Sequence, residues 1–291
     1  MSSGQPECVW ALGAELGEGP LWRARENALW FVDIKKQKAH RFDPANGERK
    51  SFDAPTQLGF LAPLPDGKFI AGLKSGLYTF DPASGGFAFR HALEADRPNN
   101  RLNDGAVDGA GRLWFGSMDD GEKDLTGKLY RLDAQGPRAM DDGYCITNGP
   151  AFSPDGKTLY HTDTLKRIIY AFDLRDDGSL SNKRIFVEIE TKAGHPDGPV
   201  VDAAGNLWTA LFGGWGARCY SPRGKLIETV KFPCANVTKI AFGGPELTTA
   251  YATTASKGLD AKARAAQPLA GGLFQFEAAT PGQPQHEVIY G

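Results

Sequence analysis

The chain has 291 residues, 41% of them apolar, and a formal net charge of −2. This length allows one large β domain or two ordinary domains with a sizeable core. The near-neutral charge provides no electrostatic footprint for nucleic acid or an anionic membrane. No apolar run approaches the roughly 20 residues of a membrane span, and residues 1–10 lack the pattern of a secretory signal. We therefore expect a cytoplasmic protein with no nucleic-acid or membrane partner.

Aromatic or apolar strand centres recur at regular intervals along the chain. Most of them follow a turn that contains Gly, Asn or Asp, and consecutive centres are 40 to 48 residues apart. The six centres are Trp30, Ile70, Trp114, Tyr160, Trp208 and Tyr251. Periods of about 40 to 50 residues with several strands each are typical of propeller blades. The sequence therefore predicts an all-β fold, a six-bladed β-propeller in which residues 1–291 form a single domain.

Two segments fall outside this strand pattern. Residues 259–267 could form a turn or two of helix within the last repeat. Residues 7–12 precede the first repeat, and we expect them to supply the outer strand of the last blade. This N-terminal strand would close the ring and leave no sheet edge open.

Four short segments place a polar residue at the same point of the repeat, 11 or 12 residues before a strand centre. They are Glu18-Gly19-Pro20, Asn103-Asp104-Gly105, Asn148-Gly149-Pro150 and Asp197-Gly198-Pro199. Equivalent positions of successive repeats form a ring in a closed fold, so a Glu, two Asn and an Asp would point to one axis. Oxygen ligands that converge on a point indicate a hard cation. Gly and Pro would hold each ligand on a rigid turn before the cation binds.

Any one of these segments on its own is more often ordinary turn chemistry than a ligand site. Two repeats lack the polar residue, because Gly59 and Thr238-Lys239 stand at the equivalent places. A purely structural role would be expected in all six repeats, whereas a ligand set needs only some of them. The five histidines are scattered, so a histidine-based zinc site is not predicted. Oxygen ligands suit Ca²⁺, Mg²⁺ or Mn²⁺, and Zn²⁺ and Fe²⁺ stay open.

Nucleophilic chemistry without a metal is poorly supported. The chain has four cysteines and no Cys-x-x-Cys pair, which favours free and mostly buried thiols. Cys145 lies three residues before Asn148, but a buried structural thiol is the favoured interpretation. The Gly-x-Ser-x-Gly elbow of serine hydrolases is absent from the sequence.

Seven motifs, in order along nearly the whole chain, carry a family resemblance. They are LGEGPLW at 16–22, RLNDG at 101–105, GSM at 116–118, TNGPA at 147–151, YHTDT at 160–164, PDG at 196–198 and FGGP at 242–245. With these motifs the sequence resembles the senescence marker protein-30, gluconolactonase and luciferin-regenerating-enzyme family. Within that family it is most similar to bacterial sugar-acid lactonases such as xylonolactonase, through LWTAL at 207–211, NVTK at 236–239 and KGL at 257–259.

The resemblance implies a six-bladed propeller with one catalytic divalent cation in its channel. Its metal ligands would be Glu18, Asn148 and Asp197, and the cation could be Fe²⁺, Zn²⁺, Mn²⁺, Mg²⁺ or Ca²⁺. Arg101 and Asn103 would contact the substrate, so that Asn103 becomes a substrate residue rather than a metal ligand. The implied reaction is hydrolysis of a sugar lactone, a pentonolactone or gluconolactone, to its aldonic acid by a monomer. The exact sugar, the size of the lactone ring and the native metal stay open.

Asp197 and Arg101 are the candidate catalytic residues. Asp197 could serve as both metal ligand and general base, and Arg101 could offset the negative charge that develops on the carbonyl oxygen. His195, two residues before Asp197, is either a neighbour of the metal ligands or a loop histidine. Two other functions compete with this one: hydrolysis of non-sugar lactones or phosphotriesters, and a non-catalytic propeller that binds a partner.

One departure from the family pattern concerns the channel mouth. Animal members carry a sugar-contacting Glu shortly after their Gly-Thr-Met motif, whereas here Gly121 stands near that place. Asp119, Asp120 and Glu122 flank it. Asp119 and Asp120 are candidates for substrate contacts, against the alternative that they are solvated loop charges.

Overall fold

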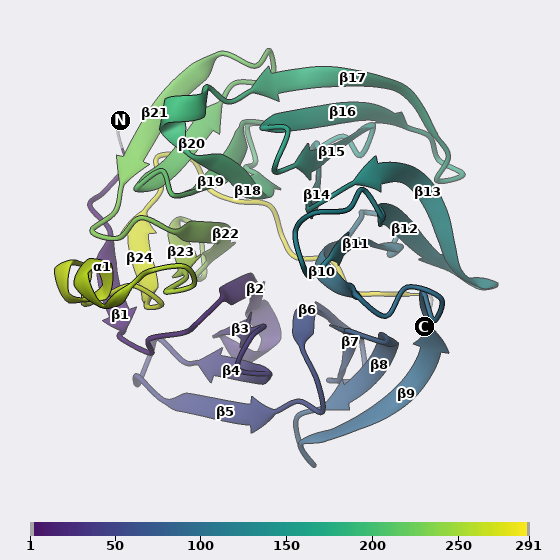
Figure 1. Ribbon diagram of the computed structural model, residues 1–291, viewed down its shortest axis with the longest axis horizontal. Coiled ribbons are helices and arrows are strands. Elements are labelled where there is room, and N and C mark those ends of the chain that lie inside the picture. The colour runs from purple at the N-terminus through teal and green to yellow at the C-terminus, as the bar shows by residue number, and fades with distance from the viewer. Residues whose placement is uncertain (1–2, 290–291) are drawn as a thin grey trace.

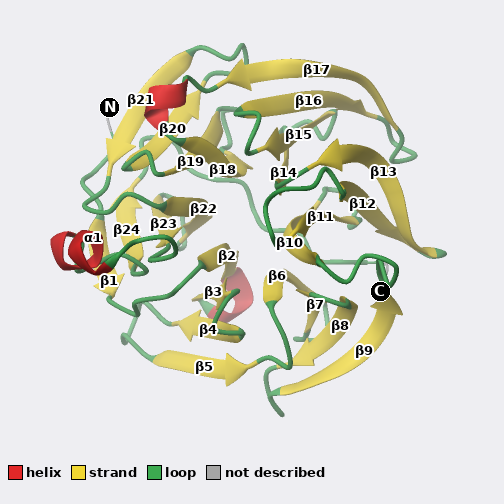
Figure 2. Cartoon of the chain, viewed as in Figure 1, coloured by secondary structure: helices red, strands yellow, loops and turns green. Residues whose placement is uncertain are grey.

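The computed structural model describes residues 3–289 and is nearly all-β, with its sheets arranged around a central channel (Figure 1). Helix is confined to α1 (Ala261–Ala266) and to two 3-10 turns, Ala24–Glu26 and Thr191–Ala193 (Figure 2). The helical segment predicted within 259–267 is confirmed as α1, which begins after an Asp260 cap that accepts from the Ala263 N–H at 2.8 Å. Within residues 3–289 no helix is long and apolar enough to cross a membrane.

Four sheets of the described chain have four strands each. The first contains β2 (Gly17–Arg23), β3 (Ala28–Asp33), β4 (Lys38–Phe42) and β5 (Arg49–Asp53). The second contains β6 (Leu58–Pro63), β7 (Phe69–Leu73), β8 (Gly76–Asp81) and β9 (Gly86–Ala92). The third contains β10 (Asn100–Val107), β11 (Leu113–Asp119), β12 (Gly127–Asp133) and β13 (Gly136–Tyr144). The fourth contains β14 (Thr147–Phe152), β15 (Thr158–Asp163), β16 (Ile168–Leu174) and β17 (Leu180–Glu188).

The remaining strands form one eight-stranded sheet. One part contains β18 (His195–Val201), β19 (Leu207–Phe212), β20 (Gly216–Tyr220) and β21 (Leu226–Lys231). The other contains β22 (Val237–Gly243), β23 (Thr249–Thr254), β24 (Leu273–Glu277) and β1 (Glu7–Trp10). Within residues 3–289, a single parallel pair, Gly198 with Lys239, joins the two parts, and the other strand pairings are antiparallel. The N-terminal strand β1 pairs with β24, as the sequence predicted.

The strands of a unit become less buried from the centre of the molecule to its rim. Every residue of β2 and β3 is buried, whereas four of the five residues of β5 are exposed. The first strand of each unit lies next to the channel, and the last lies at the rim (Figure 1). Strands covered on both faces read as continuous apolar runs, and half-solvated strands do not. The innermost strands therefore lie where polar side chains can converge, which is the architecture of a β-propeller.

Buried Trp side chains at the strand centres are fixed by an acidic residue in the preceding turn. The indole Nε1 of Trp114 donates to Asp108 at 2.8 Å, and that of Trp208 donates to Asp202 at 3.2 Å. The same two Asp side chains accept from backbone N–H groups two and four residues later. Each Asp thus closes the turn and satisfies an indole N–H that would otherwise be buried without a partner.

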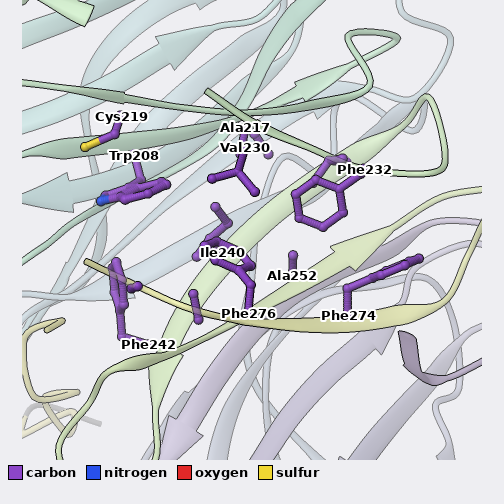
Figure 3. Close-up of a cluster of buried hydrophobic side chains, with 14 of the residues drawn as sticks. Trp208, Ala217, Cys219, Val230, Phe232, Ile240, Phe242, Ala252, Phe274 and Phe276 are labelled. Atoms are coloured by element: carbon purple, nitrogen blue, oxygen red, sulfur yellow. The ribbon is translucent and has the colours of Figure 1, made fainter. Parts of the chain in front are cut away.

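Neighbouring units pack through aromatic and aliphatic side chains. Figure 3 shows one such cluster, in which Trp208 from β19 faces Phe242 from β22 and Phe276 from β24. Their ring centroids are 6.3 Å and 6.1 Å from that of Trp208. These contacts hold the last two units together where only one backbone pair joins their sheets.

The C-terminal segment after β24 crosses the channel instead of adding a strand, as the yellow trace in Figure 1 shows. The Gly282 N–H donates to Leu247 O, and the Gln283 side chain donates to Phe152 O and Val201 O. Further on, the Val288 N–H donates to Pro63 O at 2.8 Å. This C-terminal strap, residues 281–289, therefore bonds to units on several sides of the channel.

Candidate active site

A cavity of about 180 Å³ lies at one end of the channel, and its polar lining comes from several units. The polar residues that line it are Glu18, Arg101, Asn103, Glu122, Asn148, Thr164, His195, Asp197 and Lys257. Leu165, which is 40% exposed, stands at its rim, so the cavity opens to solvent. The structure thus brings together Glu18, Asn148, Asp197, Arg101 and Asn103, five side chains that the sequence singled out.

Irregularities of strand register aim these side chains. The sequence predicted rigid turns at the four polar segments, but the structure places them within the innermost strands β2, β10, β14 and β18. The register shifts between Glu18 and Leu21 and at the matching points of the other three strands. Such bulges re-aim a side chain without ending the strand. The register also shifts at Gly59 in β6 and at Thr238 in β22, so these two strands share the bulge but lack the polar residue.

A glycine is required after Asp197 because of packing across the channel, and not because of a turn. A Cβ at this position would lie 2.6 Å from Cγ of Lys239, which is closer than real side chains approach. The absent side chain lets Lys239 pass from β22 toward β10, where its Nζ lies 2.5 Å from Oδ1 of Asp104. This ion pair is buried at both ends and spans the channel.

The Asp104 carboxylate is fully engaged. Besides Lys239, it accepts from the N–H groups of Gly105 and Gly149, each at 2.8 Å. The residues that follow the metal-ligand candidates along the inner strands, among them Pro20, Pro150 and Pro199, line a second cavity of about 140 Å³ that also contacts Lys239 and the C-terminal strap. The Asp104–Lys239 pair therefore lies between the candidate site and the strap.

Glu18 and Asp197 are buried close enough together to disfavour each other's charge. Burial raises the pKa of Asp197 well above its ordinary value, and the nearby charges of Glu18 and Asp104 raise it further. Burial and the charge of Asp104 likewise raise the pKa of Glu18. Lys239 pairs with Asp104, and among residues 3–289 neither Glu18 nor Asp197 has an ion-pair partner.

A chain of hydrogen bonds fixes the amide of Asn148. Its Nδ2 donates to Thr164 Oγ1 at 2.9 Å, which turns Oδ1 away from Thr164 and toward Asn103. Asn103 Nδ2 donates to this oxygen at 3.1 Å and to the carbonyl of Thr147 at 2.6 Å. Asn103 therefore orients Asn148, in addition to lining the cavity.

Arg101 is held in place while one nitrogen stays unused. Its Nη1 donates to Asn103 Oδ1 at 2.6 Å, and its Nε donates to Asp120 Oδ1 at 2.7 Å. Within the described range 3–289, its Nη2 has no hydrogen-bond partner. Asp120 also accepts from Lys35 and Gln57. Burial alone would raise the pKa of Asp120, but the bond from Lys35 and the charge of Arg101 hold it well below its usual range.

The acidic loop at the channel mouth differs from the pattern that the sequence suggested. Asp119 and Asp120 do not line the cavity, whereas Glu122 does. The Asp119 carboxylate is turned into its own loop, where it accepts from the N–H groups of Gly121, Lys123 and Asp124. These bonds lower the pKa of Asp119. Asp119 organises the loop, and Asp120 positions Arg101.

The structure gives different settings to His195 and Cys145, two further residues that the sequence singled out. His195 lines the cavity, and burial together with the charge of Arg167 lowers its pKa. Cys145 is a free buried thiol whose pKa is raised by burial, which supports the structural role predicted for it. All four cysteines of the chain are free.

The donor set suits a hard divalent cation. Glu18 and Asp197 provide carboxylate oxygens, and Asn148 provides an amide oxygen. A bound cation would offset the burial and the mutual repulsion that raise the pKa of the two carboxyl groups. Over residues 3–289, no three His, Cys, Asp or Glu side chains gather as a metal-binding group, since here the third donor is an amide. Carboxylate and amide oxygens are the ligands that Ca²⁺ and Mg²⁺ prefer, and none of the three candidate ligands is a histidine or a thiolate.

Comparison with known proteins places the chain in a family. Residues 16–256 match the family described as SMP-30/Gluconolactonase/LRE-like region. The chain is 34% identical over 279 residues to a 6-deoxy-6-sulfogluconolactonase from Pseudomonas putida, which covers 95% of this chain and 96% of that protein. It is 33% identical over 279 residues to the pentonolactonase XacC from Haloferax volcanii, covering 93% of each chain.

A solved structure shares the whole fold. Regucalcin from Agrobacterium tumefaciens, described as a calcium-binding protein, superimposes with a TM-score of 0.94 at 28% identity. The match covers 98% of this chain and 97% of that chain. The protein therefore belongs to the SMP-30/gluconolactonase/LRE-like family, and the resemblance seen in its sequence motifs is confirmed.

Proposed function

We propose that this protein hydrolyses a sugar lactone to its aldonic acid, with a divalent cation held by Glu18, Asn148 and Asp197. The observation that carries the proposal is the cavity itself. It combines three oxygen donors, two of them on buried carboxyl groups without an ion-pair partner among residues 3–289, with a guanidinium that has a nitrogen to spare. Its assignment as a lactonase also rests on two relatives, a sulfogluconolactonase and a pentonolactonase, that match almost its full length.

The proposal includes the architecture that positions this site. The eight-stranded sheet divides at its single parallel pair into two four-stranded units, which with the other four sheets would make six blades. We take residues 1–291 as one such domain that works as a cytoplasmic monomer. The pairing of β1 with β24 supports a ring closed by the N-terminal strand.

A lactone is a cyclic ester, so its hydrolysis requires a polarised carbonyl, a water that loses a proton and a ring oxygen that gains one. When bound, the cation supplies Lewis-acid polarisation of the carbonyl and makes a nearby water easier to deprotonate. The cation described for the regucalcin neighbour is calcium, and Mg²⁺, Mn²⁺, Zn²⁺ and Fe²⁺ are the other candidates.

Two side chains would move or stabilise charge during the reaction. The Asp197 carboxylate accepts the proton of the attacking water as the new C–O bond forms, and gives it to the ring oxygen as the ester bond breaks. Nη2 of Arg101 donates to the carbonyl oxygen as negative charge develops there. Asn103 holds Arg101 and Asn148 in register with each other, and its Oδ1 can accept from a sugar hydroxyl.

The substrate class follows from the lining of the cavity. Its many donors and acceptors suit a polyhydroxylated lactone better than an apolar ester. A volume of about 180 Å³ suits a single sugar unit. Among the candidates are neutral pentonolactones and gluconolactone. Asp119 and Asp120 would act on the substrate only through the loop and through Arg101.

The test is metal-dependent lactone hydrolysis by the full chain after chelation. Xylono-, arabinono- and gluconolactone are each assayed above their spontaneous rates, with Ca²⁺, Mg²⁺, Mn²⁺, Zn²⁺ or Fe²⁺ added back singly. We expect at least one pair of lactone and metal to restore activity. Folded protein that hydrolyses none of the lactones with any metal would refute the proposal and favour a phosphotriester or non-sugar lactone hydrolase, or a non-catalytic binding protein.

A further inference from the structure

An ion pair between two distant segments stands at the mouth of the candidate site. Glu122, from the loop after β11, and Lys257, after β23, are 135 residues apart and pair through Oε1 and Nζ. Both side chains line the cavity, and both are partly exposed, at 35% and 29%. Neither residue has a role in the mechanism above.

The backbone presents Glu122 to the cavity at a conformational cost. Its φ is +58°, a left-handed conformation that non-glycine residues rarely adopt. The loop is held there by the Asp119 carboxylate, which accepts from three of its N–H groups, and by the Glu122 N–H, which donates to Asp119 O at 3.0 Å. A strained residue that persists beside a cavity points to a function for its side chain.

Lys257 is fixed from both sides of its backbone. Its N–H donates to Glu15 O at 2.8 Å, and its carbonyl accepts from Nδ2 of buried Asn236 at 3.0 Å. The Asn236 Oδ1 in turn accepts from the Gly213 N–H at 3.1 Å. The backbone from which the Lys257 side chain extends is therefore fixed beside the cavity, and Nζ pairs there with Glu122.

We infer that Glu122 masks the charge of Lys257 and thereby makes the site selective for neutral sugar lactones over anionic ones. The inference rests on the proposed function and names its substrate class. Arg101 is also ion-paired, to Asp120, a carboxylate that it shares with Lys35. At the part of the rim that Lys257 occupies, an anionic substituent would find the ammonium already paired and would meet the Glu122 carboxylate.

The charges of Glu122 and Lys257 predict how this preference can be reversed. Glu122→Gln keeps the size of the side chain but leaves Lys257 unpaired at the cavity rim. A carboxylate or sulfonate on the far end of a lactone would then gain an ion pair in a partly dehydrated site. Lys257→Met in the same chain removes that gain.

The experiment compares two lactones of one ring size, neutral D-glucono-1,4-lactone and anionic D-glucaro-1,4-lactone. Hydrolysis of the best neutral lactone, supplied with its metal, is followed by chromatography of its own aldonate. The glucaro-lactone is added as a competitor, because it inhibits competitively whether or not it is itself hydrolysed. The readout is the ratio of the inhibition constants of the two 1,4-lactones, in which changes in metal affinity or turnover cancel.

In the wild type we expect the anionic lactone to bind more weakly than the neutral one. Glu122→Gln should tighten the anionic lactone about tenfold relative to the neutral one, and Glu122→Gln with Lys257→Met should abolish that shift. Asp173→Asn, which also removes the carboxylate of an ion pair but on the exposed outer face, should leave the ratio unchanged.

Two results would overturn the inference, and they differ. If the wild type hydrolyses a neutral lactone but Glu122→Gln leaves the ratio unchanged, the masking role is wrong and the proposed function stands. If the folded wild type hydrolyses no lactone with any metal, the proposed function fails and the inference fails with it.

Discussion

Asp104 and Asp197 are two buried carboxylates of the same channel, and the protein treats them in opposite ways. Asp104 has an ammonium at 2.5 Å and two backbone N–H donors, so its charge is compensated from within the chain. Asp197 lies beside Glu18 and has no ion-pair partner among residues 3–289. Burying an unpaired charge is expensive. The difference indicates that Asp104 serves the fold, whereas Asp197 is kept for a cation from outside.

The largest expected effect comes from neutralising Asp197. Asp197→Asn keeps the shape and one oxygen donor but cannot accept the proton of the attacking water. We expect kcat to fall on the order of 10³-fold, with the thermal stability largely retained. Lactone hydrolysis at saturating metal measures the effect. A variant that keeps more than about a tenth of the wild-type kcat would remove Asp197 from the role of general base.

Removing the partner of Asp104 should instead damage the fold. Lys239→Met leaves a buried carboxylate without its ammonium, which costs about 3 to 5 kcal/mol of unfolding free energy. Denaturant unfolding measures the loss. Adding Asp104→Asn to the same chain should recover part of it, because the stranded charge is then gone. If the single and double variants were equally destabilised, the loss would come from packing and not from charge.

A cation should reverse the cost of crowding at Glu18 and Asp197. Added metal should stabilise the wild type by about 2.7 kcal/mol at a free concentration of 100 times Kd. Without metal, Glu18→Gln should be more stable than the wild type, because the repulsion between Glu18 and Asp197 is relieved. Added metal should stabilise this variant only slightly. Thermal unfolding with and without metal checks both signs. Equal metal stabilisation of the two proteins would exclude Glu18 as a ligand.

Buried titratable groups outside the channel give the smallest effect and a third behaviour. Burial lowers the pKa of His161 to about 3 and that of His40 to about 4, so both are neutral in the fold. Their unfolded pKa is about 6.5, and this stability is therefore present above that pH and lost as the pH falls toward the folded values. As the pH falls from 7.5 to 5, each histidine should lower the free energy of unfolding by about 2 kcal/mol.

His161→Met isolates one of these contributions. The change in unfolding free energy over this pH interval should be about 2 kcal/mol smaller in the variant than in the wild type. An identical pH dependence in the two proteins would mean that His161 is not the group that titrates.

The features that the sequence could predict are those that repeat. The strand centres such as Trp114 and the positions of Glu18, Asn148 and Asp197 follow from a period of 40 to 48 residues, because equivalent positions in a repeat fold meet at one axis. The family motifs then separated Asn103 from the candidate metal ligands. Local pattern and period together were enough for the β architecture and for the set of side chains that share the cavity.

The features that it missed depend on single contacts across the ring. Lys239 and Asp104 are 135 residues apart in the sequence. They meet because their strands face each other across the channel and because Gly198 has no Cβ in the way. Glu122 lines the cavity instead of Asp119, because the Asp119 carboxylate accepts hydrogen bonds from N–H groups of its own loop. Neither contact leaves a periodic trace, so composition and spacing could not predict it.

The C-terminal strap decides how the channel exchanges its contents. Residues 283–286 line the inner cavity on the side away from Glu18 and Asp197, and the Asp104–Lys239 pair lies between. A channel that is obstructed at one end is accessible from the other end only. Under the proposed function, substrate and product would share the mouth between Glu122 and Lys257, so the product would compete with substrate for the free protein.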